Sequence, residues 1–127
     1  MSKKDDILDD LIFKHNEARI NRFLWKRNPL RKNDELMQHA QEWAYNMAGQ
    51  NRLYHGDIFK IMDLGFSSAS ENIAHGQINV NEVMQSWMLS PGHRSNILNR
   101  NFTDIGCGVA SSEQDARLFW CVCFGQK

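Results

Sequence analysis

Three side chains in this 127-residue chain have the chemistry of a metal or acid–base site: His55, Glu71 and His93. Two neutral imidazoles can bind zinc or a similar divalent ion, with water or a carboxylate completing the coordination shell. A glutamate beside a histidine can instead orient the ring, or act as a general base on a metal-bound water. In a third interpretation these polar groups only form hydrogen bonds with one another and so stabilise the loops that carry them.

The segment around His93 predicts how this histidine is positioned. Pro91 cannot continue a helix and Gly92 allows the backbone to turn, so we expect His93 at a sharp bend, aimed into a polar pocket that His55 and Glu71 also line. Apolar residues before the bend recur at helical spacing: Val80, Val83, Met84 and Trp87.

Two further helices precede this segment. The spacing of apolar residues predicts one from Asp5 to roughly Trp25, with Phe23 on its apolar face, and a second from Asp34 to Ala48. Asn33 or Asp34 suits the start of the second helix, and Gly49 suits a left-handed residue at its end. The stripe of the second helix consists of Leu36, Ala40, Trp43, Ala44 and Met47.

The rest of the chain divides into a loop-rich part and a strand-rich part. Residues 49–79 show no long period and are expected to form loops with one short helix near Ile58–Leu64. Residues 104–110 alternate as a strand does, and residues 118–124 have the composition of a strand covered on both faces. Helices followed by paired strands predict an α+β domain with an antiparallel sheet.

Composition excludes several classes of protein. The chain has 15 basic and 15 acidic residues, which argues against a protein that holds nucleic acid by counterion release. No apolar run approaches the roughly 20 residues of a transmembrane helix. We expect a single domain over residues 1–127, a monomer, with residues 1–6 as a flexible N-terminus.

The first ten residues lack the apolar core and the cleavage site of a signal peptide. Two compartments therefore stay open: the cytosol, or the outside of the cell after removal of a leader.

The three cysteines lie near the C-terminus: Cys107, Cys121 and Cys123. The Cys-Val-Cys spacing places two sulfurs on one face of a strand, where they cannot readily bond to each other, although either could face Cys107 across a hairpin. Three interpretations stay open: buried reduced thiols, one disulfide to Cys107, or a metal role.

Taken together, these motifs resemble the CAP superfamily (cysteine-rich secretory proteins, antigen 5 and pathogenesis-related 1 proteins) in its bacterial, SCP-like form. The motifs follow the order of the family from about residue 8 to residue 125: His15-Asn16-x-x-Arg19, Leu36…Ala40…Trp43-Ala44, Tyr54-His55, Glu71-Asn72-Ile73-Ala74, Trp87-x-x-Ser90-Pro91-Gly92-His93-Arg94-x-Asn96-Ile97-Leu98 and Ile105-Gly106-Cys107-Gly108.

The resemblance implies a three-layer α-β-α sandwich with a central antiparallel sheet and a cleft containing two histidines and two acidic residues. His55, Glu71 and His93 match three members of this set, and Ser90 occupies the position of the second acidic residue. Glu82 is a nearby carboxylate, although the helical pattern places it on the solvent side. Asn72, Ser90 and His75 are expected to line the cleft together with Glu71.

The functions implied by the family do not share one reaction. The leading hypothesis is a non-enzymatic or weakly enzymatic domain whose cleft binds a small molecule, a lipid or a protein, through zinc or another divalent cation or without one. A metal-dependent hydrolase is the first alternative, with His55 and His93 as ligands and Glu71 as general base. The second is an interaction module for a protein or cell-wall component that uses residues 56–79. The family suggests a secreted or extracytoplasmic protein.

Overall fold

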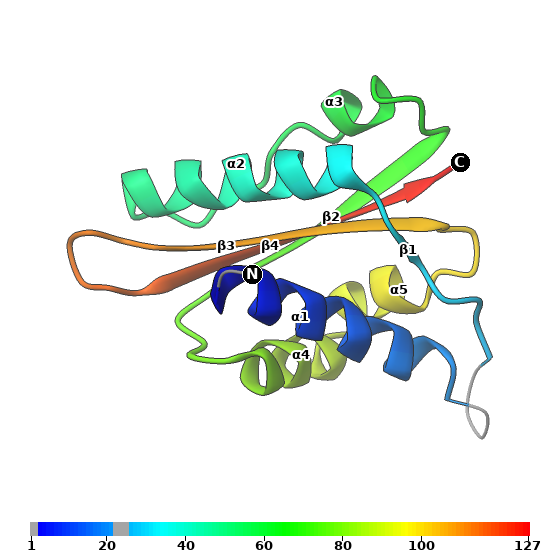
Figure 1. Ribbon diagram of the computed structural model, residues 1–127, viewed down its shortest axis with the longest axis horizontal. Helices are drawn as coiled ribbons and strands as arrows, with labels where there is room; N and C mark the ends of the chain where they lie inside the picture. Colours follow the sequence, from blue (N-terminus) through cyan, green and yellow to red (C-terminus); the bar gives the residue numbers. More distant parts are fainter. Residues whose placement is uncertain (1–2, 22–25) are drawn as a thin grey trace.

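A four-stranded sheet lies between two layers of helices (Figure 1). This computed structural model describes residues 3–21 and 26–127. Helices α2 and α3 cover one face of the sheet, and α1, α4 and α5 cover the other, as expected of an α+β, α-β-α sandwich. The elements in chain order are α1 (Lys3–Arg19), β1 (Arg31–Lys32), α2 (Asp34–Gln50), α3 (Ile58–Met62), β2 (Ser68–His75), α4 (Val80–Leu89), α5 (Pro91–Leu98), β3 (Asp104–Ser111) and β4 (Leu118–Gln126).

The sheet is mixed, which corrects the expectation of a purely antiparallel one. Its strand order is β1-β3-β4-β2, and β1 runs parallel to β3 while the other pairs are antiparallel. Strand β1 contains only two exposed basic residues, so no apolar pattern marks it. The backbone on either side holds it in place: Arg31 N donates to Thr103 O over 2.9 Å, and Asn33 N donates to Ile105 O over 3.0 Å.

Strand β2 was missed in the loop-rich interpretation of residues 49–79. It is eight residues long and pairs along its whole length with β4, at the edge of the sheet. Its sequence, SASENIAH, is mostly small and polar, and Ile73 is its one β-branched residue, so it has little of the β-branched and aromatic content that indicates a strand. The short helix expected near Ile58–Leu64 is present as α3.

The first helix differs from its prediction at both ends. It begins at Lys3 rather than Asp5, so the expected flexible segment 1–6 is helical from Lys3 onward. Asp5 and Asp6 lie in its first turn, where carboxylates favour the positive end of the helix dipole. It ends at Arg19, whose carbonyl accepts a hydrogen bond from Arg27 N. Of the residues predicted to continue it, Ile20 and Asn21 are not helical, whereas residues 22–25, with Phe23 and Trp25, lie outside the described residues.

The second helix is as predicted at its start and longer at its end. The Asn33 side chain accepts a hydrogen bond from Leu36 N over 3.0 Å, as an N-cap does. The helix continues past Gly49, and Asn51 takes the left-handed conformation instead, with φ 49° and ψ 45°. Asparagine tolerates this conformation better than most residues, so the end was placed two residues early.

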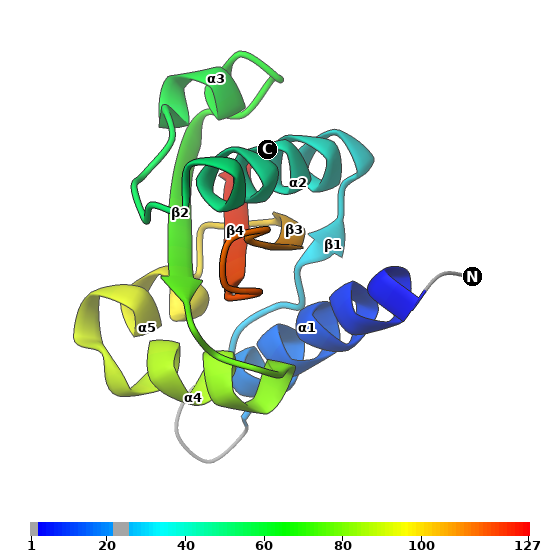
Figure 2. The same cartoon turned by 90° about the vertical axis from the view of Figure 1, so that its left-hand side faces the viewer.

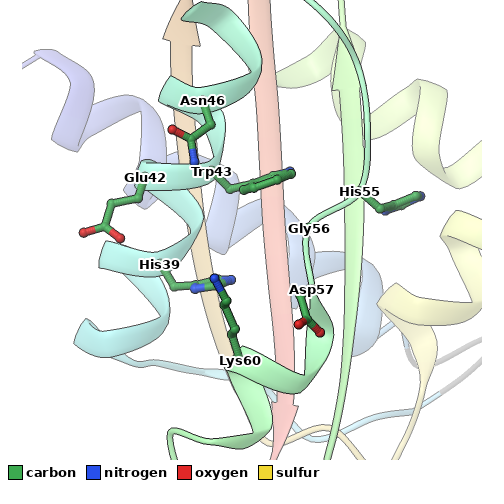
Figure 3. A pocket seen from close by; sticks show the side chains of 8 residues that line it. All are labelled: His39, Glu42, Trp43, Asn46, His55, Gly56, Asp57 and Lys60. Atoms are coloured by element: carbon green, nitrogen blue, oxygen red, sulfur yellow. The ribbon is translucent and has the colours of Figure 1, made fainter. Parts of the chain in front are cut away.

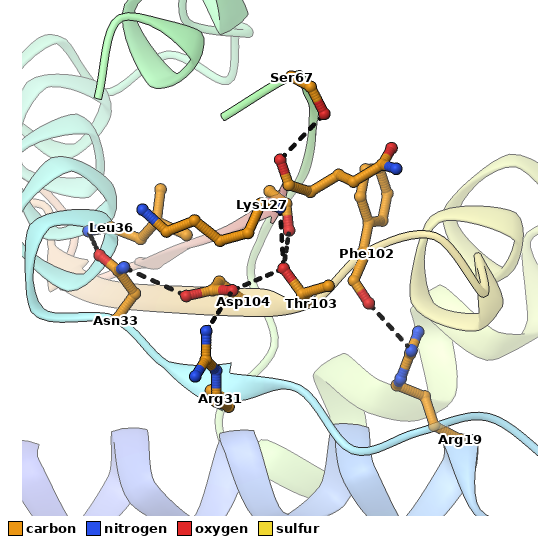
Figure 4. Close-up of polar contacts among 11 residues, drawn as sticks. Arg19, Arg31, Asn33, Leu36, Ser67, Phe102, Thr103, Asp104 and Lys127 are labelled. Carbon is orange, nitrogen blue, oxygen red and sulfur yellow. Dashed lines mark hydrogen bonds and ion pairs between the residues drawn. The ribbon is translucent and has the colours of Figure 1, made fainter. Parts of the chain in front are cut away.

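A buried carboxylate anchors the start of α2 to the sheet (Figure 4). Asp104 is buried at the beginning of β3 and accepts hydrogen bonds from Asn33 Nδ2 over 3.2 Å and from Thr103 Oγ1 over 2.6 Å. The guanidinium of Arg31 lies 3.8 Å from the same carboxylate. The N-cap of α2, strand β1 and strand β3 are therefore held together by one charged group.

Two glycines of β3 allow α2 to lie directly on the sheet. A Cβ atom at Gly106 would lie 2.2 Å from the carbonyl carbon of Leu36, and one at Gly108 would lie 2.4 Å from the Cα of Gln41. Both neighbours are helix backbone, which cannot move aside alone. These glycines therefore set the distance between α2 and the sheet that carries Glu71.

The bend expected at His93 is instead the start of a helix. Ser90 separates α4 from α5 with extended backbone (φ −101°, ψ 117°), and Pro91 is the first residue of α5. Proline fits this position because the first residues of a helix need no backbone N–H donor. His93 therefore lies on the first turn of α5. In the described part of the chain, no helix is long and apolar enough to cross a membrane.

Candidate functional site

The candidate site lies along the exposed edge of β2. Strand alternation sends Glu71 toward the α2 layer and Asn72 toward the α4–α5 layer. His55 belongs to the segment between α2 and α3, which passes beside β2 in Figure 2, and His93 belongs to α5 on the same side. The pKa of His93 is lowered by partial burial and then by repulsion from His55.

His55 is oriented by the buried carboxylate of Glu71. Its Nδ1 lies 2.9 Å from Glu71 Oε1, and the same oxygen accepts a hydrogen bond from Gly56 N over 2.9 Å. The Glu71 side chain is only 2% exposed, whereas that of His55 is 62% exposed. Because a carboxylate accepts hydrogen bonds, the neutral His55 ring carries its proton on Nδ1 and presents an unprotonated Nε2 outward.

His93 is held in a similar way by a serine. Its Nδ1 lies 2.8 Å from Ser90 Oγ, so the residue at the position where the resemblance implies a second acidic residue contacts the ring directly. The backbone of His93 is fixed as well, since Asn72 Nδ2 donates to its carbonyl over 3.0 Å and Asn96 Nδ2 donates to Asn72 Oδ1 over 2.8 Å. Partial burial, and then repulsion from His55, lower the pKa of His93.

Two other residues considered from the sequence lie away from this pair. His75 is at the far end of β2, where its ring stacks on Phe119 with 5.5 Å between centroids. Glu82 is exposed in the first turn of α4. The structure therefore brings His55, Glu71, Ser90, His93 and Asn72 together, and it places His75 and Glu82 elsewhere.

The imidazole pair suits a divalent cation in its donor chemistry but is incomplete as a protein site. Within residues 3–21 and 26–127, both Nε2 atoms lack a protein hydrogen-bond partner, as metal ligands require. Over the same residues, the group of three or more His, Cys, Asp or Glu ligand atoms within 4.8 Å of one another does not include either histidine. Water or the ligand itself would have to complete the coordination shell.

A polar pocket of about 510 Å³ adjoins His55 on the α2 side of the segment (Figure 3). His39, Glu42 and Asn46 line it from α2, and Asp57 and Lys60 line it from the opposite wall. The His55 ring points away from these side chains, so it lies at the rim. Sequence reasoning missed this pocket, because the polar face of an amphipathic helix is ordinarily solvated.

His39 is one of the residues of α2 that line this pocket. Its Nε2 is buried and has no hydrogen-bond partner among the described residues. Trp43, one turn further along α2, donates from Nε1 to Tyr54 O over 2.9 Å and so holds the segment that carries His55.

Of the three interpretations of the cysteines, the disulfide to Cys107 is wrong, and buried free thiols agree with the structure. Cys107 pairs with Val122 in the sheet, so its side chain points to the face opposite Cys121 and Cys123. Cys107 packs in the core under α1 and α4, whereas the other two pack under α2. All three are free and buried.

The pattern of residues at this edge and the order of the elements together indicate a family. The cysteine-rich secretory protein (CAP) family model matches residues 13–124. The chain belongs to this family. It is 38% identical over 92 residues to the uncharacterized protein YkwD of Bacillus subtilis, a match covering 66% of the chain and 36% of YkwD. The chain thus spans about a third of that relative's length.

Solved structures of other bacterial proteins share the fold. An outer surface protein of Borrelia burgdorferi superposes with a TM-score of 0.83 at 24% identity, covering 100% of this chain and 96% of that one. An extracellular SCP-domain protein of Bacillus anthracis gives a TM-score of 0.84 at 24% identity, covering 98% of this chain and 41% of that one. At these identities the likeness concerns the fold alone.

Proposed function

We propose that this CAP domain is a binding protein whose ligand contacts the Nε2 atoms of His55 and His93, with a divalent cation such as zinc as the group between them. One observation carries the proposal: both rings are held at Nδ1, by Glu71 and by Ser90, which leaves the other nitrogen of each ring for a ligand. Metal-binding histidines use the same arrangement. A bound cation would supply a Lewis-acidic contact for an oxygen of the ligand.

The geometry supports binding better than hydrolysis. A general base must reach the proton that it removes, whereas Glu71 is buried and its Oε1 already accepts hydrogen bonds from His55 and Gly56. Glu71 therefore acts as a positioning residue for His55. The alternative of an interaction module has less support, because β2 occupies eight of the residues 56–79 that would provide its loops.

The first test is a zinc titration of metal-stripped protein, followed by calorimetry and by NMR of the histidine ring nitrogens. We expect binding with a Kd of about 1 µM or tighter and shifts of the His55 and His93 signals. The His55→Ala/His93→Ala variant should lose the zinc equivalent that shifts these histidine signals. The matched control is His39→Ala/His75→Ala, which removes two other histidines and should bind as the wild type does. Zinc binding without shifts at His55 and His93 would contradict the proposal.

A second prediction concerns the orientation of His55. Glu71→Gln keeps the size of the side chain but loses its charge, and zinc affinity at the histidine pair should fall about 10- to 100-fold, as for other partners of metal-bound histidines. Glu82→Gln changes the same charge at an exposed position and should have no effect. Equal affinities of Glu71→Gln and wild type for zinc would show that Glu71 does not orient a ligand.

An extracytoplasmic location is part of the same proposal. Its support comes from two relatives: the Borrelia burgdorferi protein is described as an outer surface protein, and the Bacillus anthracis protein as an extracellular one.

A further inference from the structure

Two thiols and a carboxylate meet in the core beneath α2. Glu71 on β2 lies directly opposite Cys123 on β4, and Cys121 is the next residue on the same face of β4. Cys121 Sγ lies 3.7 Å from Glu71 Oε2 and 3.8 Å from Cys123 Sγ. The ligand atoms of all three residues lie within 4.8 Å of one another.

These distances match the edges of a metal coordination shell. A tetrahedral ion with metal–sulfur bonds of about 2.3 Å holds two sulfurs about 3.8 Å apart, and a sulfur and a carboxylate oxygen about 3.6 Å apart. The two measured separations agree with both values, and the third edge, from Cys123 Sγ to the Glu71 carboxylate, is at most 4.8 Å.

Among the described residues, the Oε2 atom of Glu71 has no strong hydrogen-bond donor. Glu71 Oε1 accepts the hydrogen bonds from His55 and Gly56, whereas Oε2 faces the Cys121 thiol, which is a weak donor. A buried carboxylate oxygen normally has stronger partners. Burial, the neighbouring Cys123 and the charge of Glu71 raise the pKa of Cys121, so without an ion this thiol keeps its proton.

The geometry of Cys121 and Cys123 fits a disulfide between them less well than it fits a metal ion. Residues i and i+2 of a strand have Cα atoms about 6.6 Å apart, near the upper limit for a disulfide. Both cysteines pair in register with β2 and β3, so closing this bond would bend the central part of the sheet.

We propose that Glu71, Cys121 and Cys123 form a buried binding site for a thiophilic divalent cation of the zinc class. Binding releases the two thiol protons to solvent, and the two thiolates and the carboxylate then contact the ion. This site is separate from the histidine pair, because it uses Oε2 and the sulfurs under α2 rather than the Nε2 atoms at the edge of β2.

The route for the ion runs through the segment between α2 and α3. A Cβ atom at Gly56 would lie 3.2 Å from Glu71 Oε2 and 3.1 Å from the Trp43 ring, so this glycine lies directly over the carboxylate. Movement of this segment away from β2 would expose Oε2 and then the Cys121 sulfur.

The test is a cadmium titration of the reduced, metal-free protein, read by the ultraviolet charge-transfer band of thiolate-bound cadmium. We expect the band to saturate at one thiolate-bound cadmium ion per chain, and competition by zinc should remove the band. The Cys121→Ser/Cys123→Ser variant should lose the band. Cys107→Ser removes a thiol that is equally buried but on the opposite face, and it should keep the band.

Two further measurements keep the result interpretable. Cadmium NMR of the wild type counts the sulfur ligands without any substitution, in case the double serine variant does not fold; two are expected. The His55→Ala/His93→Ala variant should keep the band, which separates this site from the proposed function. The absence of a band in the folded, reduced wild type, or a band that survives in the folded double serine variant, would overturn the proposal.

Discussion

Replacing Arg19 by methionine should lower the free energy of unfolding by about 3–5 kcal/mol, as expected when a buried hydrogen-bonded cation is removed. Arg19 is fully buried, and no carboxylate among the described residues lies within ion-pair distance of it. Backbone carbonyls satisfy its guanidinium instead. Nε donates to Asn28 O, Nη1 to Ile97 O and Asn99 O, and Nη2 to Phe102 O (Figure 4 shows the last), at 2.8–3.3 Å.

The expected loss of stability has its cause in the carbonyl oxygens that bind the Arg19 guanidinium. Methionine fills much of the space but donates no hydrogen bond, so the four carbonyls lose the guanidinium as a donor, and among the described residues only Asn99 O keeps another donor, Phe102 N, at 3.3 Å. Urea denaturation followed by tryptophan fluorescence measures the change. Lys14→Met is the matched control: it removes a positive charge from the same helix at a partly exposed ion pair with Glu17, which contributes at most about 1 kcal/mol. Equal stabilities of the two variants would contradict the assignment.

Arg19 also links the stability of α1 to the candidate site. Two of its acceptors, Ile97 and Asn99, lie at and just beyond the C-terminal end of α5, whose first turn carries His93. The family resemblance included Arg19, but its burial could not be predicted from the sequence alone, because arginine is almost always exposed. Only the fold shows that the carbonyls of a distant segment surround this side chain.

The elements that could be predicted from sequence are those with a strong period. The stripe of α2 and the apolar run of β4 stand out because burial of one face, or of both, requires such a pattern. Strand β2 could not be found this way. Its small and polar residues are explained by the structure: Glu71 and Asn72 hold neighbouring segments by hydrogen bonds rather than by apolar packing.

The candidate site, too, could be predicted only in part from the sequence. Spacing alone does not bring His55 and His93 together, and the family resemblance supplied that pairing. The resemblance also marked Ser90 as a missing acidic residue, whereas the structure gives its hydroxyl a direct contact with the His93 ring. The Glu71–Cys121–Cys123 group could not be predicted from the sequence. The pairing of β2 with β4 brings these residues together, and β2 has no strand pattern in its sequence.

Acid should destabilise this protein through His15. Burial lowers the pKa of His15 to about 4, although its hydrogen bond to Leu11 O opposes the shift and the charge of Arg19 adds to it. Nδ1 donates to Leu11 O over 2.8 Å, while Nε2 is buried without a partner beside the rings of Trp87 and Phe124. A proton on Nε2 would therefore place an unpaired charge in an apolar core.

The direction of the pH effect follows from the two states of the chain. In the unfolded chain His15 takes up a proton near pH 6.5, whereas in the folded protein it does so only near pH 4. The unfolded state binds more protons between these values, so stability is complete above pH 6.5 and falls as the pH drops toward 4, by on the order of 3 kcal/mol in total. Urea denaturation at a series of pH values measures this slope.

The substitution His15→Leu separates this histidine from other acid-sensitive groups. Leucine has a similar volume and no titratable group, so the variant should lose most of the slope between pH 6.5 and 4. His93, whose pKa is also lowered, leaves a slope of the same sign in both proteins. The ring signal of His15 should titrate near pH 4 by NMR. Parallel stability curves for wild type and His15→Leu would show that the folded protein accepts the proton on His15 at little cost.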